Sequence, residues 1–311
     1  MSNLVIDSHS HVGKDIFHGE STIDGYIDFA KKSHINVGII MGVPSPCIDL
    51  KDPSTRFMYW KFNGINIEFY GKKNPFSEMN YELNELLKEK SSDALQLLFV
   101  PTFHPILDEI EQFEKMLVIT DPVAIKIHGI GSGVGPDDIS QDYIELIKKY
   151  ELPVIVHVDC DFGKGSQSMQ YVRNINRAIL WAKFFERNKI KGILNHGASL
   201  DLDTFELVNN SDYLRIALGP DKIACIDNNR LFFDCQSDYK EYLRFLKKNL
   251  DTSKILYDAD YNWNKIEGQV DDYESVERVK EIFGDGSDAV DILSNNLLDF
   301  NPKILKKIRR K

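Results

Sequence analysis

The feature that most constrains the fold is an alternation that runs along the whole chain. Apolar runs with strand character recur, and stretches with helical period lie between most of them. The strand candidates cover residues 4–8, 36–42, 95–102, 123–127, 153–158, 192–195, 231–235 and 255–259. The helix candidates cover residues 23–32, 80–90, 108–117, 138–150, 169–188, 202–209, 239–249 and 273–283. Strict alternation predicts an α/β fold with a parallel sheet covered by helices, and eight repeats predict closure into a (β/α)8 TIM barrel.

The length of the chain is consistent with a single barrel. A (β/α)8 barrel typically takes about 250 residues, so 311 residues leave room for insertions. No internal stretch rich in Pro, Gly or Ser divides the chain, and we expect residues 1–311 to form one domain. A doubly wound open sheet is the alternative fold. It would place a glycine-rich phosphate turn after the first strand, and residues 7–13 do not form such a turn.

Residues 43–79 form an insertion after the second strand that is too long for an ordinary connection. Its aromatic residues are Phe57, Tyr59, Trp60, Phe62, Phe69, Tyr70 and Phe76. As a loop at the carboxyl end of a strand, the insertion would cover the mouth of the barrel, where Trp60 would contact a substrate. The alternative is an aromatic cluster that packs against the outer helices or a partner subunit, which would allow a homodimer.

Composition excludes several classes of partner. The net charge of −10 argues against nucleic acid, because phosphate binding requires a basic surface. No apolar stretch approaches the roughly 20 residues that span a bilayer, and the first residues lack the features of a signal peptide. We therefore expect a cytoplasmic protein with a small-molecule substrate and no membrane partner. The basic cluster at 303–311 is typical of a solvated helix face. The four scattered cysteines are typical of reduced thiols.

Histidines gather at the carboxyl ends of the strand candidates. The run LVIDSHSH at 4–11 ends in His9 and His11, whose side chains project from the same side of a strand because successive residues alternate. Histidines also end or follow later strand candidates, namely His104, His128, His157 and His196. The carboxyl ends of barrel strands converge on one rim, where barrel enzymes build their sites. We therefore expect these imidazoles to meet.

The last strand candidate adds carboxylates to the same rim. Asp258 and Asp260 lie two residues apart in ILYDADY, so both point to one side. Three imidazoles with one carboxylate suit Zn²⁺, and they also accept Mn²⁺ or Fe²⁺. The residue types at this rim therefore predict a site for a divalent metal ion.

Several of these segments occur together in one known family. They are IDSHSH at 6–11, AIKIHG at 124–129, PVIVH at 153–157, ILNHG at 193–197, LFFD at 231–234, ILYDADY at 255–261 and ILSNNLL at 292–298, which includes Asn296. In this order and spacing the chain resembles the amidohydrolase superfamily, within it the amidohydrolase-related (amidohydrolase 2) branch of metal-dependent hydrolases and decarboxylases. The resemblance spans nearly the whole chain.

The resemblance implies one divalent metal ion, with the ligands His9, His11, His157 and Asp260. The family's eighth strand usually ends in Gly-Ser-Asp-Tyr, which aligns Asp260 with the ligand aspartate. Asp258 stands in place of that glycine and is the alternative ligand. In the family, the histidine at the position of His196 is either a ligand to a second metal or a catalytic group.

Other polar residues near the expected rim are candidates for substrate binding. Lys126, His128 and His104 are the first of these, and Arg215 and Arg230 are further candidates for holding a substrate carboxylate. Some members of the superfamily bridge two metals with a carboxylated lysine, but the resembled branch does not lead us to expect one, so Lys126 is consistent with a single ion. Its alternative role is a buried lysine paired with a carboxylate such as Asp7.

These residues together predict a metal-dependent hydrolase of an amide, lactone or ester bond. A divalent ion lowers the pKa of bound water to about 7. We expect Asp260 to take the proton of that water and return it to the leaving group, and His196 to polarise the substrate carbonyl. A purely structural His196 is the alternative. Non-oxidative decarboxylation of an aromatic or enoic acid is the alternative reaction, and a non-catalytic scaffold is a third possibility.

Overall fold

Eight parallel strands form the centre of the computed structural model, which describes residues 4–15, 19–43, 60–69, 71, 73–158, 167–219, 235–261, 274–284 and 286–308. The strands are β1 (Ile6–Asp15), β3 (Val37–Gly42), β6 (Gln96–Val100), β7 (Ile125–Ile127), β8 (Val154–Val156), β9 (Gly192–Leu194), β10 (Leu214–Ala217) and β11 (Ile255–Leu256). Parallel ladders order them β1-β3-β6 and β7-β8-β9-β10-β11. A short strand, β2 (Gly19–Ser21), pairs antiparallel with the end of β1.

Backbone contacts join these two sheets at both edges. Thr102, which follows β6, forms a parallel bridge with Lys126 on β7. At the other edge, the amide of Ser8 on β1 donates a hydrogen bond of 3.1 Å to the carbonyl of Tyr257, which follows β11. The strands therefore succeed one another around a closed ring, and the predicted (β/α)8 barrel is confirmed.

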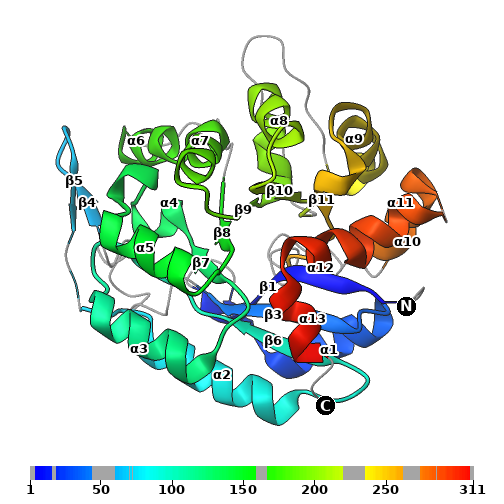
Figure 1. Ribbon diagram of the computed structural model, residues 1–311, viewed down its shortest axis with the longest axis horizontal. Helices are drawn as coiled ribbons and strands as arrows, with labels where there is room; N and C mark the ends of the chain where they lie inside the picture. The colour runs from blue at the N-terminus through cyan, green and yellow to red at the C-terminus, as the bar shows by residue number, and fades with distance from the viewer. Residues whose placement is uncertain are drawn as a thin grey trace.

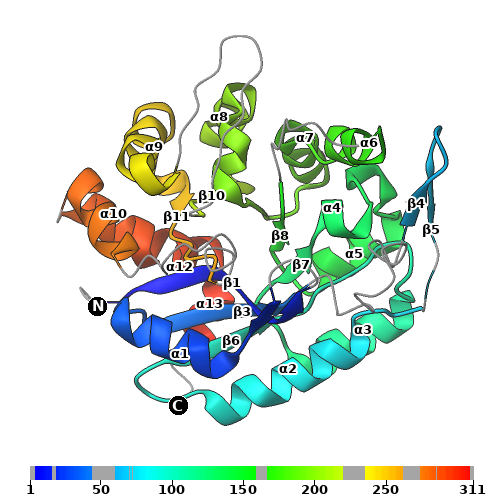
Figure 2. The ribbon, with the colours of Figure 1, turned by 180° about the vertical axis from the view of Figure 1, so that it is seen from behind.

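Helices surround this ring on its outside, as Figures 1 and 2 show from opposite sides. They are α1 (Ile23–Lys32), α2 (Ser77–Lys90), α3 (Ile110–Thr120), α4 (Gly129–Ser132), α5 (Gln141–Lys149), α6 (Gln167–Ile175), α7 (Ala178–Asn188), α8 (Leu202–Asn209), α9 (Cys235–Asn249), α10 (Ser275–Phe283), α11 (Ser287–Val290), α12 (Asn296–Phe300) and α13 (Pro302–Ile308). Shorter helical turns are η2 (Pro136–Asp138), η3 (His196–Leu200), η4 (Thr252–Lys254) and η6 (Asp291–Asn295). None of the helices that the structure describes has the length and apolar composition needed to cross a membrane.

The prediction of the seventh strand is wrong. The strand lies at Leu214–Ala217, whereas residues 231–234 are outside the described part of the chain and Cys235 begins α9. The reason is Arg215, which interrupts the apolar run LRIA in the sequence. Its guanidinium lies 4.6 Å from the centre of the Phe300 ring at the floor of the barrel. A charged residue therefore occupies a strand position at which the sequence pattern of a buried strand favours an apolar residue.

The single helix predicted over 169–188 is two helices, α6 and α7. The break falls at Asn176, which is completely buried. Its side-chain amide donates to the carbonyls of Val134 and Val172, and its oxygen accepts from the indole nitrogen of Trp181. These three side-chain bonds compete with the helical pattern, which explains why the helix stops there.

Two layers of apolar side chains follow from the alternation along the strands. Residues of one parity pack outward against the helices, among them Ile40, Phe99, Ile125, Val154 and Ile216. Residues of the other parity fill the interior, among them Ile39, Val100, Ile155, Ile193 and Leu256. The interior cluster continues into Leu297, Phe300 and Ile304 of α12 and α13. These two helices lie in front of the strands in Figure 1, and they close the amino end of the barrel.

The insertion at 43–79 is described only from Trp60 onward. It contains an antiparallel hairpin of β4 (Trp60–Phe62) and β5 (Ile67–Phe69), which Figure 1 shows projecting from one side of the molecule. Phe69 lies 5.8 Å from the ring of His104, measured between ring centres, and packs with Ile130 of α4 in one small cluster. Because His104 and Ile130 follow β6 and β7, this part of the insertion lies on the side of the carboxyl ends of the strands.

Candidate metal centre

An irregularity in β1 turns two histidines into the barrel. Ile6 belongs to the interior core, and unbroken alternation would therefore direct His9 and His11 outward. The register between β1 and β3 shifts between Asp7 and Ser10, which marks a β-bulge. Beyond this bulge His9 and His11 face the interior, with exposed fractions of 0% and 2%. The bulge thus explains how both imidazoles reach the carboxyl end of the barrel.

Asp7 holds this bulge from the outer face of β1. Its Oδ1 accepts from the amides of His9 (3.2 Å) and Ala259 (2.9 Å), and its Oδ2 accepts from the hydroxyls of Ser10 (2.6 Å) and Tyr26 (2.8 Å). Burial raises the pKa of Asp7 to about 6, although the four hydrogen bonds oppose this shift. Asp7 therefore connects β1 with α1 and with the segment after β11. The sequence analysis considered Asp7 only as a partner for Lys126 and did not predict that it stabilises the bulge.

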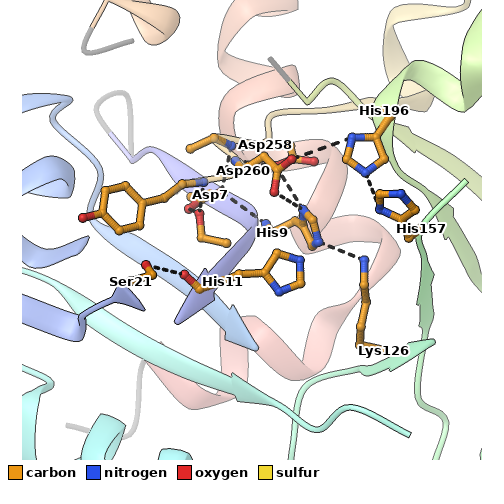
Figure 3. A network of polar contacts seen from close by, with 12 residues as sticks. Asp7, His9, His11, Ser21, Lys126, His157, His196, Asp258 and Asp260 are labelled. Atoms are coloured by element: carbon orange, nitrogen blue, oxygen red, sulfur yellow. Dashed lines mark hydrogen bonds and ion pairs between the residues drawn. The ribbon is translucent and has the colours of Figure 1, made fainter. Parts of the chain in front are cut away.

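Lys126 contacts a histidine and not Asp7. It is fully buried between Ile125 and Ile127 on β7, and its Nζ lies 2.9 Å from Nε2 of His9 (Figure 3). If Nζ donates to Nε2, the contact occupies the lone pair of that nitrogen, and His9 can bind a metal through Nε2 only when Lys126 turns to another partner. The interpretation of Lys126 as the partner of Asp7 is wrong, because the four donors described above occupy that carboxylate.

The two aspartates after β11 lie on the other side of His9. Nδ1 of His9 is 3.5 Å from Oδ1 of Asp258 and 3.4 Å from Oδ1 of Asp260. The amide of Asp260 donates to Oδ1 of Asp258 (2.9 Å) and to the carbonyl of His9 (3.0 Å). Asp260 has a φ of +42°, a left-handed conformation that costs a non-glycine residue roughly 1–3 kcal/mol. These two hydrogen bonds hold the main chain of Asp260 in this conformation.

His9, His11 and Asp260 form a group that fits a metal ion. One ligand atom of each lies within 4.8 Å of the others, and all three residues are buried. Nδ1 of His11 lies 3.3 Å from the carbonyl of Gly42, which can only accept, so Nδ1 carries the hydrogen and Nε2 keeps its lone pair. This Nε2 is buried and has no hydrogen-bond partner within the part of the chain that the structure describes. A buried lone pair of this kind suits a cation.

A second set of histidines adjoins this group. Nε2 of His196 lies 2.8 Å from Nδ1 of His157, and Nδ1 of His196 lies 3.7 Å from Oδ2 of Asp260 (Figure 3). The ring of His128 stacks on that of His157 at 4.1 Å, measured between ring centres. Asp260 therefore lies between His9 and His196. His157 belongs to this second set and is not a member of the group of three within 4.8 Å.

Burial keeps His9, His11 and His157 neutral. It is the largest cause that lowers the pKa of His9, His11 and His157 well below 6.5, and the neighbouring imidazoles and Lys126 act in the same direction. Neutral imidazole is the form that binds metals. The site therefore offers lone pairs at pH 7 without first losing a proton.

His128 has its tautomer fixed by local backbone structure. It is the N-cap residue of α4, and its Nδ1 accepts a hydrogen bond of 2.9 Å from the amide of Gly131. In the neutral imidazole Nε2 must then carry the hydrogen. His128 can therefore donate a hydrogen bond beside His157.

The remaining candidates from the sequence lie elsewhere or outside the described residues. His104 uses Nδ1 to accept from the amides of Ile106 and Leu107, both at 3.3 Å, and burial lowers its pKa to about 4. Arg215 lies at the amino end of the barrel against Phe300, far from the rim. The side chain of Trp60 and all of Arg230 fall outside the described part of the chain.

Sequence comparison finds no relative: no family model matches the chain, and no curated protein matches it. Solved structures do match along nearly the whole chain. A putative 2-pyrone-4,6-dicarboxylic acid hydrolase from Pseudomonas putida has a TM-score of 0.62 and 12% identity, with 96% of this chain and 98% of that chain covered. A probable hydrolase of the same kind from Acinetobacter baumannii, crystallised with citric acid, has a TM-score of 0.58 and 12% identity, with 96% and 99% covered.

A protein of another kind matches as well. A TatD homologue from Escherichia coli K12 has a TM-score of 0.54 and 16% identity, with 97% of this chain and 99% of that chain covered. At such identities the matches establish the fold, which is the barrel of the amidohydrolase and TatD proteins. The resemblance to the amidohydrolase superfamily that the sequence indicated is therefore confirmed at the level of the fold.

Proposed function

We propose that the protein is a metal-dependent hydrolase that cleaves an amide, lactone or ester bond of a small molecule. The observation that carries this proposal is the buried group of His9, His11 and Asp260, whose ligand atoms converge within 4.8 Å at the carboxyl end of the barrel. Support also comes from the structural neighbours, two of which are described as 2-pyrone-4,6-dicarboxylic acid hydrolases. That compound is a lactone, which is one of the predicted substrate classes.

His9, His11 and Asp260 would hold one divalent ion, and His157 is the fourth ligand that the sequence resemblance implies. The proposed ion is Zn²⁺, with Mn²⁺ and Fe²⁺ as alternatives, since all accept imidazole and carboxylate ligands. When bound, such an ion supplies Lewis acidity, which lowers the pKa of water from 15.7 to about 7. Asp258 is better suited to orient Asp260 and His9 than to bind the ion, because its Oδ1 accepts the amide of Asp260.

Asp260 is the proposed general base. Its Oδ1 faces His9 and its Oδ2 faces His196, so the carboxylate lies where the two sets of histidines meet. A carboxylate held by its backbone can accept a proton from water and return it to the leaving group. Among the described carboxylates, only those of Asp258 and Asp260 lie within 4.0 Å of an imidazole nitrogen of His9 or His196.

His196 has two roles that its contacts allow. If Nδ1 of His157 donates to Nε2 of His196, then Nδ1 of His196 carries the hydrogen and points toward Asp260. His196 then orients the base. With the opposite tautomers, Nε2–H of His196 donates to Nδ1 of His157. His196 then polarises a substrate carbonyl, the role expected from the sequence, only when this hydrogen turns from His157 to the substrate. The first arrangement leaves Nε2 of His157 with a lone pair, which agrees with its proposed role as a ligand.

Lys126 and His128 are the proposed contacts for the polar groups of the substrate. Lys126 brings a buried cation to 2.9 Å from His9, and His128 presents an Nε2 hydrogen next to His157. Both groups donate, so they favour a substrate that carries a carboxylate or another acceptor near the scissile bond. Roles for His104 and Trp60 in substrate binding, a homodimer and a cytoplasmic location stay predictions.

The decisive experiment combines metal analysis with a substrate panel. The purified protein should contain about one divalent ion per chain. It should hydrolyse at least one of a set of lactones, esters and amides, 2-pyrone-4,6-dicarboxylate among them, as measured by released acid for lactones and esters and by released amine for amides. Removing the ion with a chelator should abolish turnover, and adding Zn²⁺ should restore it. Release of CO₂ from a carboxylic acid without hydrolysis of any lactone, ester or amide would instead identify a decarboxylase.

A further inference from the structure

A basic pocket lies at the amino end of the barrel, opposite the rim that carries the histidines. It is a cavity of about 630 Å³. Its wall includes residues that directly precede strands, such as Leu152 before β8, Lys191 before β9 and Tyr213 before β10. The last turn of α5, the residues that directly follow α7 and the helix α13 complete it. The pocket is therefore separate from the proposed active site.

Positive charge is concentrated in this pocket although the chain as a whole carries a net charge of −10. Its lysines are Lys148, Lys189, Lys191, Lys303, Lys306 and Lys307, and its only carboxylates are Asp121 and Glu151. Asp121 alone pairs with both Lys303 (2.7 Å) and Lys307 (3.0 Å). Within the described part of the chain, Lys189, Lys191 and Lys306 have no carboxylate within 4.0 Å. The pocket therefore has an excess of cations.

Two half-buried cations extend this charge into the floor of the barrel. Nζ of Lys191 lies 5.3 Å from the centre of the Phe300 ring. The guanidinium of Arg215 lies 4.6 Å from the centre of the same ring. Both bind main-chain carbonyls, Lys191 that of Phe300 (2.6 Å) and Arg215 that of Leu214 (2.7 Å). Burial and the charge of Arg215 lower the pKa of Lys191. An anion at this place would relieve the repulsion between the two cations.

Helix ends account for only part of this charge. The carboxyl ends of α3, α5 and α7 point toward the pocket, and each carries about half a negative charge. Glu145 pairs with Lys148 at 3.8 Å, so three carboxylates stand against six lysines and three positive charges remain. The three helix ends compensate about one and a half of these charges. The remaining positive charge is available to an anion from solution.

We infer that this pocket binds a small molecule that carries two or more phosphate groups. A volume of about 630 Å³ lies within the usual size of small-molecule sites, roughly 300–1,000 Å³. Lysines bind phosphate as point charges, and Tyr150 and Tyr213 offer apolar surface and hydroxyls for the rest of the ligand. A pocket of this size on an acidic chain favours a metabolite over nucleic acid.

The test is calorimetric titration of the full chain with fructose 1,6-bisphosphate and with inositol hexakisphosphate. We expect saturable binding of one molecule per chain, weaker at about 0.5 M than at about 0.05 M salt because the contacts are ionic. Lys189→Gln/Lys306→Gln should weaken binding at least about tenfold. Both lysines are exposed and form no ion pair within 4.0 Å among described residues, so this variant should fold.

Lys115→Gln/Lys248→Gln is the matched control, since it removes the same charge from exposed positions that do not line the pocket. Its affinity for both probes should equal that of the unchanged protein. The proposal is overturned if neither probe binds saturably, or if both double variants weaken binding equally. A lower melting temperature of Lys189→Gln/Lys306→Gln without any binding by the unchanged protein would show that the lysines serve only the helix ends. None of these measurements depends on hydrolase activity.

Discussion

The contacts of His196 allow its two proposed roles to be separated by a pair of substitutions. In His196→Asn the side-chain amide takes the place of Nδ1, the atom that faces Asp260 at 3.7 Å. In His196→Gln the amide reaches the place of Nε2, the atom that lies 2.8 Å from Nδ1 of His157. Each variant therefore keeps one contact of the imidazole and loses the other.

The expected magnitude follows from the contact with Asp260. A hydrogen bond to a charged group contributes about 1.5–3 kcal/mol. Because 3.7 Å exceeds an ordinary hydrogen-bond distance, we take the lower value, which corresponds to about a tenfold change in rate. If His196 orients the base through Nδ1, His196→Gln should lose about tenfold in kcat/KM, and His196→Asn should stay within about threefold of the unchanged enzyme.

The assay is kcat/KM for the best lactone, ester or amide of the panel, with the metal content of each variant measured in parallel. Equal metal content is needed, because His196 contacts His157, a proposed ligand. The opposite order of activities, with His196→Gln the better enzyme, would refute the orienting role. It would instead support polarisation of the substrate carbonyl through Nε2.

Four further outcomes are expected. Asp260→Asn should keep most of the bound metal and lose at least about a hundredfold in kcat, since an amide oxygen can ligate but cannot shuttle a proton; unchanged turnover would exclude it as the base. His157→Ala should lower the metal content measured by atomic absorption, and full occupancy would remove this residue from the ligand set. Lys126→Met should raise KM for a carboxylate-bearing substrate more than for a neutral one, as steady-state kinetics would show. Burial raises the pKa of Asp108 to about 7, so its protonated form stabilises the fold at low pH and this contribution is lost as the pH rises through 7. In urea unfolding, the free energy of unfolding of Asp108→Asn relative to the unchanged protein should therefore rise by about 2 kcal/mol between about pH 5 and pH 8. This value allows for the half-buried position of the residue. An unchanged difference would contradict the raised pKa.

The sequence predicts seven of the eight barrel strands because their side chains are apolar on both faces. Runs such as those of β3 and β6 are buried against helices on one side and against the interior on the other. β10 is not predicted because Arg215 occupies an interior position of this strand. The ring of Phe300, at the floor of the barrel, accommodates the charge of Arg215. A single sequence gives no sign that a cation belongs there.

The candidate site is predicted in its residue types but not in its local geometry. Spacing alone brings His9 and His11 to one face, and this holds in the structure. The direction of that face depends on the bulge between Asp7 and Ser10, and a run such as DSHS shows no glycine or proline that would mark it. The bulge is stabilised by Tyr26, a contact across 19 positions that no local pattern reveals.

The two ends of the barrel can be related by distance. Lys191 at the basic pocket and His196 at the rim stand five positions apart along β9, which at about 3.3 Å per residue is about 16 Å. Two unit charges at that distance interact by about 1 kcal/mol at an effective dielectric constant of about 20. An anion in the pocket would thus change the metal affinity at the rim by only about fivefold for each charge. A larger effect would require the strands themselves to move, because the interior between the two ends is filled by tightly packed apolar side chains.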